Sequence, residues 1–321
     1  MTGTSAAPIV GRAVVHELYG IRIRVPWRVR GLEAVDGPWD VEFVEGDAAT
    51  LARAASYVPS AQSGRWAQSA ELPDGSNYRC WRDLFEFVVT PDARLIQARV
   101  AGRVHDEALL AYLLVDALSF SMIRLGWEPL HATAVHTDDG AVAFLGDSGR
   151  GKSTLAAALI RGGSKLVTDD MLVLTPQEDR LRAQPGPPRI KLYREMAMHI
   201  FGAADDGVPM NSATEKLILP LTVQQSARAS APLTAMYVLH EAPAGSAVAI
   251  RRLTPARAMT AALAATAGHF PFDPDRLKRQ FSFITTLVQR VPILSLSYSR
   301  CAAEIEDVRD AVLLDLRRHA A

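Results

Sequence analysis

A glycine-rich stretch near the middle of the chain, "FLGDSGRGKST" (residues 144–154), places a lysine and two hydroxyls directly after three glycines. Gly146, Gly151, Lys152 and Ser153 fit the pattern G-x-x-x-x-G-K-[ST] of a phosphate-binding loop. Glycines in such a loop let successive backbone N–H groups turn toward phosphate oxygens at the N-terminus of a helix. The pattern therefore predicts a nucleotide site, with Lys152 at the β- and γ-phosphates and the Ser153 hydroxyl on Mg²⁺.

The residues on either side of the loop support this interpretation. An apolar run precedes it and an alanine-rich run, "STLAAALIR", follows it, which predicts a strand, a loop and a helix in that order. The alternative is an ordinary glycine turn with a surface lysine, which this combination disfavours. The residues predicted to bind the nucleotide are Gly146, Asp147, Ser148, Gly149, Arg150, Gly151, Lys152, Ser153 and Thr154.

Two adjacent carboxylates interrupt the next apolar run, "KLVTDDMLVL" (residues 165–174). Carboxylates are rarely buried in a strand without a partner, so something must offset the charge of Asp169 and Asp170. Because successive side chains of a strand point to opposite faces, we expect the two to have different roles. One would hold Mg²⁺ or accept the proton of an attacking hydroxyl. The alternative is a turn that splits the run and leaves both carboxylates in solvent.

Residues 130–174 resemble the core of the HPr kinase/phosphorylase family of bacterial serine kinases. That family has a His opening a strand, the loop GDSGxGKS, and a "DD" pair on the next strand. A looser similarity, carried by "YGIRIRVPW", "EKLILPL" and "LTAMYVLHE", is to a divergent branch whose relatives include kinases encoded beside lasso-peptide genes. Those relatives phosphorylate a serine of the precursor peptide. The resemblance implies an α/β fold, with a P-loop kinase domain of HPr kinase/phosphoenolpyruvate carboxykinase type.

The resemblance also implies roles for particular residues. His131 matches the family's active-site histidine, Lys152 its loop lysine and Asp170 its proton acceptor. Ser153 matches the metal-binding serine, and Asp169 is the carboxylate expected to join it at the metal.

Two departures from the family pattern limit what carries over. Thr154 stands where the family usually has an acidic residue, so one carboxylate near the metal is missing. The later glycine-rich "IRGLG" segment has no counterpart, and "PPRIKLYREMA" stands in its approximate place. Since that segment is associated with the reverse, phosphorylase reaction, we do not expect this chain to catalyse it.

Other charged residues have two interpretations each. Arg189, Lys191 and Lys216 lie where a basic group could neutralise γ-phosphate charge, although for each residue alone the sequence favours a solvated surface group. Glu195 could supply a metal carboxylate or be an exposed residue of a helix. His136 has no support beyond its place near His131.

Composition and spacing also predict the organisation of the chain. Short strand-like runs separated by turn residues predict a β-rich N-terminal domain over residues 1–105, followed by the P-loop kinase domain over residues 106–321. The apolar run at residues 109–123 contains Asp116 and is shorter than the roughly 20 residues of a membrane span, so we expect a buried helix. One face of a last helix, from about residue 302, would carry Ile305, Val308, Val312 and Leu316.

The overall charge indicates no general affinity for polyanions. Lys plus Arg and Asp plus Glu are 35 each, so we expect neither nucleic acid nor a membrane surface as a partner. The two cysteines, Cys80 and Cys301, have no metal-site spacing, and the first residues do not form an export signal. A cytoplasmic location is therefore expected, and the family resemblance suggests a homo-oligomer.

The leading hypothesis is a kinase that uses ATP or GTP with Mg²⁺ and phosphorylates a serine hydroxyl of a peptide or protein. A second hypothesis of the same class is a kinase for a small hydroxylated metabolite. A third, of a different class, is a nucleotide-binding switch or slow ATPase that acts on a partner without phosphorylating it.

Overall fold

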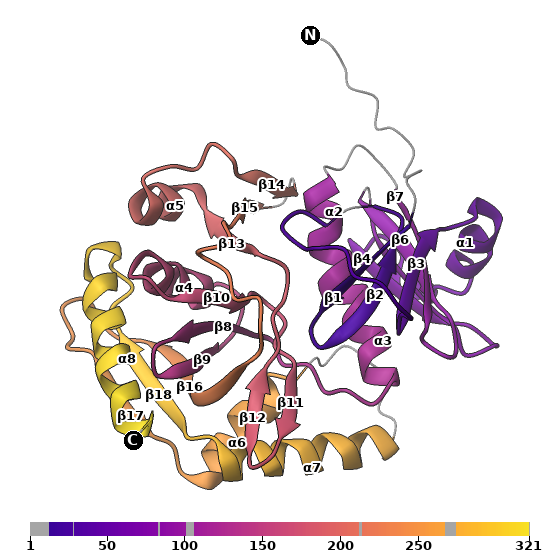
Figure 1. Cartoon of the computed structure of the whole chain (residues 1–321). Coiled ribbons are helices and arrows are strands. Elements are labelled where there is room, and N and C mark those ends of the chain that lie inside the picture. The colour runs from indigo at the N-terminus through magenta and orange to yellow at the C-terminus, as the bar shows by residue number, and fades with distance from the viewer. Residues whose placement is uncertain are drawn as a thin grey trace. The chain divides into compact units, whose positions relative to one another are not determined.

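The computed structural model describes residues 13–27, 29–82, 84–100, 106–211, 214–266 and 274–320. It has the mixed α/β character that the sequence predicts, with strands and helices in two compact units (Figure 1). The first unit comprises residues 1–125 and 208–214, and the second comprises residues 126–207 and 215–321. Each unit has its own sheet and is described separately.

The first unit is built on a seven-stranded sheet in the order β1-β2-β3-β7-β6-β5-β4. In β2 the apolar residues Ile21, Ile23 and Val25 are buried and the arginines between them are partly exposed, as alternation in a half-buried strand requires. The strands of this sheet are β1 (Val14–Leu18), β2 (Ile21–Val25), β3 (Val41–Glu45), β4 (Ala67–Glu71), β5 (Asn77–Trp81), β6 (Phe85–Val89) and β7 (Leu95–Val100).

Helices pack on both faces of this sheet. On one face α1 (Ala48–Ala55) buries Leu51 and Ala54 against residues of β5 and β6. On the other face the apolar run predicted as a buried helix forms α2 (Asp106–Tyr112), a single π-helical turn (Leu113–Ala117) and α3 (Leu118–Arg124). A short 3₁₀ turn (Ser60–Gln62) and β14 (Val208–Asn211) complete the unit.

The division between the units differs from the domain boundary expected at residues 105 and 106. The ring of Tyr112 lies 6.0 Å from that of Trp81 and 5.3 Å from that of Phe85, measured between centroids. These aromatic contacts tie α2 to the first sheet, so the units divide after Leu125. The aromatic partners of Tyr112 lie far from it in the sequence, so local patterning does not reveal them.

The second unit is built on an eight-stranded sheet whose main run is β10-β8-β9-β16-β18-β17. Strands β9, β16 and β18 are parallel, whereas β8, β10 and β17 make antiparallel pairs and the β11–β12 hairpin joins the start of β16. The strands are β8 (Ala132–Thr137), β9 (Gly140–Leu145), β10 (Lys165–Thr168), β11 (Leu174–Gln177), β12 (Arg180–Ala183), β16 (Ala231–Glu241), β17 (Ala249–Arg252) and β18 (Ile293–Tyr298).

Strand β9 is buried on both faces, as expected of a strand in the parallel centre of a sheet. Val142 and Phe144 face one apolar core, which contains α4 (Lys152–Arg161), α5 (Arg194–Phe201) and α8 (Ile305–Ala320). Ala143 and Leu145 face a second core, which contains α6 (Pro255–Ala264) and α7 (Pro274–Arg290). The loop that leaves β9 therefore leads directly into α4 on the first of these faces.

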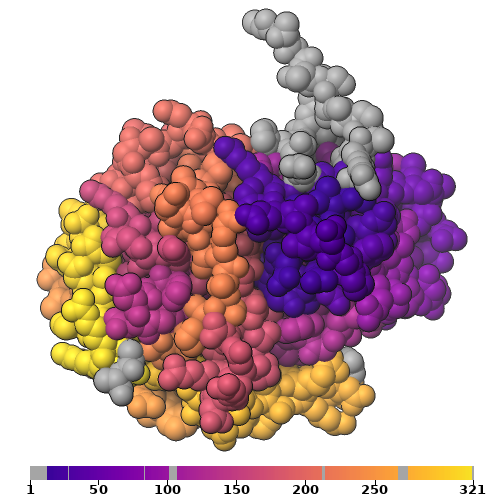
Figure 2. All heavy atoms as spheres, in the orientation of Figure 1, coloured from indigo at the N-terminus to yellow at the C-terminus, as the bar shows by residue number. Residues whose placement is uncertain are grey.

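Strand β13 (Arg189–Tyr193) leads into α5 and pairs antiparallel with β15 (Thr214–Pro220). A 3₁₀ turn (Ala302–Glu304) connects β18 to α8. The four residues predicted to share one face of this last helix are all buried, so that prediction is confirmed. Figure 2 shows α8 in yellow at the surface of the second unit.

The run predicted as one strand at residues 165–174 is divided. Strand β10 ends at Thr168 and β11 begins at Leu174, with Asp169 and Asp170 in the bend between them. Asp170 has a φ of +70°, a conformation that a non-glycine residue seldom adopts.

Among the residues that the structure describes, no helix is long and apolar enough to span a bilayer. The predicted cytoplasmic location stays a prediction.

We predict that Leu316→Ala lowers the free energy of unfolding by about 2–5 kcal/mol, because the fully buried side chain leaves a cavity under α8. Leu314→Ala, on the same helix but 55% exposed, is the matched control and should change it by no more than about 0.5 kcal/mol. Urea unfolding followed by far-UV circular dichroism measures both. Equal losses in the two variants would contradict the packing of α8 described above.

Candidate functional site

The predicted phosphate loop lies between β9 and α4, as its sequence pattern requires. Gly146, Gly149 and Gly151 have φ values of +143°, +81° and +92°, a region that favours glycine. A Cβ atom at Gly151 would also lie 2.8 Å from the hydroxyl of Tyr298, so a side chain there would require the Tyr298 ring to shift. The glycines of the motif therefore allow backbone conformations with positive φ, and Gly151 also leaves room for Tyr298 of β18.

Lys152 is the first residue of α4, and it is only 5% exposed. Its Nζ donates to the carbonyl oxygens of Gly146 at 2.7 Å and Asp147 at 3.2 Å, and to Nε2 of His131 at 2.9 Å. Burial is the main cause that lowers the pKa of this lysine. An ammonium held in this way, inside its own loop, lies at the place where a bound polyphosphate would need it.

The contacts of His131 determine its tautomer. An ammonium has only donors, so Nε2 of His131 must accept from Lys152. The ring proton therefore lies on Nδ1, which donates to the carbonyl oxygen of Asp170 at 3.1 Å. Burial and the neighbouring Lys152 charge lower the pKa of His131, so the ring is neutral at neutral pH. His131 thus connects the loop lysine to the bend at Asp170.

Asp169 is 7% exposed and makes three hydrogen bonds. Its Oδ1 accepts from the hydroxyls of Ser153 at 2.8 Å and Thr133 at 2.7 Å, and its Oδ2 accepts from the backbone N–H of Lys191 at 2.9 Å. Burial and the negative charge of Asp170 raise the pKa of this carboxyl. Asp169 is therefore neither solvated nor distant from the loop, and it lies beside the serine expected to bind the metal.

Asp170 points to a different partner, as two adjacent residues in a bend can. Its Oδ2 lies 2.6 Å from Nζ of Lys191, and the two side chains are 23% and 9% exposed. Burial alone would raise the pKa of Asp170, but the Lys191, His131 and Lys152 groups outweigh it and hold this pKa well below its ordinary value. Asp170 is a carboxylate throughout the neutral range, and its charge in turn raises the pKa of Lys191 despite burial.

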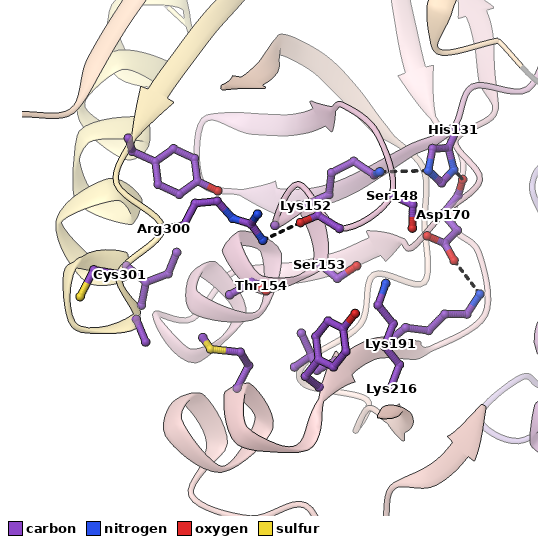
Figure 3. Close-up of a pocket in the computed structure, with 18 residues that line it drawn as sticks. His131, Ser148, Lys152, Ser153, Thr154, Asp170, Lys191, Lys216, Arg300 and Cys301 are labelled. Atoms are coloured by element: carbon purple, nitrogen blue, oxygen red, sulfur yellow. Dashed lines mark hydrogen bonds and ion pairs between the residues drawn. The ribbon is translucent and has the colours of Figure 1, made fainter. Parts of the chain in front are cut away.

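His131, Lys152, Ser153, Asp170 and Lys191 line one cavity, whereas Asp169 lies behind Ser153 and does not line it (Figure 3). Its charged residues are Lys152, Lys191, Lys216, Arg300 and Asp170, so cations outnumber carboxylates on its wall. In Figure 3, Lys152 points to His131 and Lys191 points to Asp170. Apolar groups form another part of the wall, supplied by Leu192, Tyr193, Met196, Tyr298 and Ile305. A polyanion with an uncharged portion suits this combination.

Three charged side chains, Glu241, Arg150 and Arg300, hold the outer side of the loop. The Glu241 carboxylate, at the end of β16, lies 3.7 Å from the Arg150 guanidinium and 3.6 Å from that of Arg300. Arg300 also donates to the carbonyl oxygen of Gly149 at 2.6 Å. The three side chains are about half exposed, so solvent screens these pairs and they mainly fix the position of the loop.

The residues predicted to bind the nucleotide fall into two groups. Ser148, Gly149, Gly151, Lys152, Ser153 and Thr154 line the cavity. Gly146, Asp147 and Arg150 do not, because the first two turn their carbonyls to Lys152 and Arg150 turns to Glu241. Their parts in nucleotide binding stay predictions.

The residues around Asp169 fit a magnesium ion. The described part of the chain contains no cluster of three or more His, Cys, Asp or Glu side chains suited to a metal. Mg²⁺ does not need one, since it keeps several waters and commonly takes one or two protein ligands together with substrate phosphates. The Ser153 hydroxyl and the Asp169 carboxylate supply such a pair of oxygen ligands.

The other candidates are distributed unevenly. Lys191 and Lys216 line the cavity, whereas Arg189 is buried elsewhere on β13, so none of the three is a plain surface group. Glu195 is exposed on α5 and does not line the cavity, which argues against its predicted metal role. His136 lies on β8 outside the cavity.

Sequence reasoning missed Thr133, Glu241, Arg300 and Tyr298 as parts of the site. Thr133 has a signal that could have found it, because a polar residue stands two positions after His131 among the apolar residues Ala132, Ala134 and Val135. Arg300 and Glu241 have no local signal, because only the pairing of β16 with β9 and β18 brings them to the loop.

No protein-family model matches this sequence, and no curated protein matches it either. Among solved structures, the HPr(Ser) kinase/phosphatase from Coxiella burnetii is similar, with a TM-score of 0.30 and 13% identity. The match covers 59% of this chain and 98% of that one. At this TM-score the likeness carries no argument, and the family assignment stays a prediction from residues 130–174.

We predict that His131 makes stability depend on pH. Its pKa in the folded chain lies below the ordinary 6.5, so below that pH the unfolded chain binds more protons and stability falls as pH falls. His131→Gln should remove this component, which amounts to at most about 1.4 kcal/mol per pH unit. Thermal unfolding at about pH 7.5 and about pH 5.5 tests this. The exposed His240, changed to Gln, is the control. An unchanged pH dependence in His131→Gln would contradict the prediction.

Proposed function

We propose that this protein is a kinase that transfers the γ-phosphoryl group of ATP or GTP to a hydroxyl, with a serine of a peptide or protein as the acceptor. One observation carries the proposal: the loop lysine Lys152 and the ionised carboxylate of Asp170 line the same cavity. A phosphate-binding group and a proton acceptor in one cavity are the two parts that hydroxyl phosphorylation requires.

The triphosphate would lie along the glycine loop. Backbone N–H groups at the start of α4 point toward this place, and the helix dipole favours an anion there. On binding, phosphate oxygens would replace the loop carbonyls and His131 as partners of Lys152. Lys216 and Arg300 would add positive charge along the same wall.

Ser153 and Asp169 would hold Mg²⁺. Such an ion would neutralise phosphate charge, which would favour departure of the nucleoside diphosphate. The contribution of the chain is to keep the Asp169 carboxylate in place: Thr133 and the backbone N–H of Lys191 fix it from two sides. This arrangement also accounts for a buried carboxylate whose pKa is raised and which would gain from a cation.

Asp170 would accept the proton of the acceptor hydroxyl. As the acceptor oxygen bonds to the γ-phosphorus, the bond from that phosphorus to the β–γ bridging oxygen breaks and the nucleoside diphosphate leaves. The hydroxyl proton passes to Oδ2 of Asp170. A carboxylate with a lowered pKa is a weak base, but a loose transition state needs orientation of the hydroxyl more than early proton removal.

Lys191 links the two halves of this reaction. Its ammonium pairs with Asp170 and lines the cavity, so from this position it would reach toward a γ-phosphoryl group bound there. A shift of Lys191 toward the phosphate would weaken the pair and make Asp170 more basic as charge develops.

The acceptor class rests on the resemblance to kinases of precursor peptides. A small hydroxylated metabolite would use the same donor chemistry. A switch or slow ATPase would direct water, and not a substrate hydroxyl, to Asp170. Product analysis separates these three possibilities.

We predict that Lys152→Ala abolishes phosphoryl transfer, because it removes the ammonium from the triphosphate. Asp170→Asn should lower the rate about 10²- to 10⁴-fold and spare nucleotide binding, as for loss of a general base. The assay is intact-mass spectrometry of candidate serine peptides incubated with the protein, Mg²⁺ and ATP or GTP. A gain of one phosphoryl group, about 80 Da, marks transfer.

Three outcomes would count against this proposal in different ways. Near-normal transfer by Asp170→Asn would remove the carboxylate from the mechanism. Nucleotide hydrolysis without a phosphorylated peptide would favour the ATPase or the metabolite kinase. No nucleotide binding by the unaltered chain would exclude all three hypotheses.

We further predict that Lys191→Met moves the acid limb of the pH–rate profile to higher pH by about one unit or more. Without Lys191, only the His131 and Lys152 groups oppose the effect of burial, so the pKa of Asp170 rises and its carboxylate form is lost sooner as pH falls. Lys216→Met is the matched control, since it removes an ammonium from the same wall, one that lies over the Tyr193 ring. If the acid limb of the pH–rate profile does not move in Lys191→Met, Lys191 does not set the pKa of the group that accepts the proton.

A further inference from the structure

A basic groove lies on the second unit, away from the cavity just described. We call it the arginine groove, and the side chains used here are His240, Arg251, Arg252, Arg257, Ser295 and Ser297. None of them lines the catalytic cavity. Figure 1 shows β17, which carries two of the arginines, at the outer side of its sheet next to β18.

Strand register places the groove on the sheet face opposite to α4. Leu296 and Tyr298 of β18 belong to the core that contains α4 and α8. Because side chains alternate, Ser295 and Ser297 point to the other face. Ser297 pairs with His240 of β16, and Ser295 pairs with Arg251 of β17, so these side chains share that face.

The groove carries positive charge that no carboxylate of the described residues pairs with. Arg251, Arg252 and Arg257 are exposed, and within the described residues none of them makes an ion pair with a carboxylate. Glu241 follows His240 along β16, but its carboxylate already pairs with Arg150 and Arg300. Acidic and basic residues balance over the whole chain at 35 each, so this excess is local. A local, unpaired cluster of guanidinium groups suits carboxylates, which they bind bidentately.

The floor of the groove ends at an unpaired strand edge. Strand β17 pairs with β18, and nothing in the described chain pairs with its other side. The N–H of Leu253 donates to Ile293 of β18, so by alternation the backbone groups of Ile250 and Arg252 point outward. An extended peptide can add to such an edge by main-chain hydrogen bonds, with pockets reading alternate side chains.

We propose that the arginine groove binds an acidic peptide segment that extends along β17. Main-chain groups of the segment would pair with Ile250 and Arg252, and its carboxylates would pair with the side chains of Arg251 and Arg257. A polynucleotide or an anionic bilayer would use the charge but not the strand edge, so the edge favours a peptide. The proposal does not depend on the kinase function and holds for a catalytically inactive chain.

The test is fluorescence anisotropy with a short fluorescein-labelled peptide in which Glu alternates with Val. The Lys152→Ala chain is used, so that catalysis plays no part in the signal. Arg251→Glu and Arg257→Glu should each weaken binding at least about tenfold, since each replaces an attraction by a repulsion. Arg317→Glu and Arg318→Glu, exposed on α8, make the same charge change elsewhere and should leave the affinity within about twofold.

Two further peptides separate charge from strand pairing. Gln in place of Glu should abolish binding, because no carboxylate remains for the arginines. Pro in place of alternate Val keeps the charge but removes main-chain donors, and should weaken binding at least about tenfold.

Several results would overturn the proposal. Equal binding of the proline peptide would exclude pairing along β17. Equal losses in the α8 controls would show a response to net charge alone. If phosphatidylserine vesicles at matched charge displace the labelled peptide, the groove is a binding site for anionic membranes and not for a peptide. If the Glu–Val peptide does not bind, the groove is not a peptide site. The arginines would then only prevent the edge strand β17 from pairing with other chains.

Discussion

The site depends on placing two adjacent carboxylates out of water at the end of β10. Burial of either charge is costly unless a partner compensates for it, and burial of both side by side adds their repulsion. The chain divides the compensation: hydroxyls and a backbone N–H hold Asp169, and the Lys191 ammonium holds Asp170. Strand β13 must therefore lie beside the phosphate loop, because it supplies both the N–H and the ammonium of Lys191.

His131 extends this arrangement to the loop. One ring nitrogen accepts from Lys152 and the other donates to the backbone of Asp170, so a neutral ring couples a cation to a bend with a positive φ. His131 thereby holds the Lys152 ammonium and the backbone of Asp170 at a fixed separation, and it does so as an uncharged ring. The arrangement is preorganised, since the groups that would bind phosphate and orient a hydroxyl are in place before either arrives.

Local patterns predicted much of this chain, and their limits are physical. The loop between β9 and α4 and the buried face of α8 follow from spacing over a few residues, which the sequence displays directly. The pair of Lys191 with Asp170 depends on the packing of β13, and the place of Arg300 depends on a parallel pairing of β16 with β18. Helix α2 belongs to the first unit because Tyr112 packs against the rings of Trp81 and Phe85, which are distant from it in the sequence. Spacing within one element cannot reveal contacts between elements.

The approach of Tyr298 to Gly151 has a consequence for the order in which the site can form during synthesis. The ribosome releases the glycine loop well before β18, yet Tyr298 and Arg300 make one wall of the cavity and fix the outer side of the loop. A nascent chain that has exposed only the loop therefore lacks one wall of the cavity. In the proposed kinase, nucleotide would not stabilise early intermediates of the second unit, because the complete cavity requires that β18 has joined the sheet.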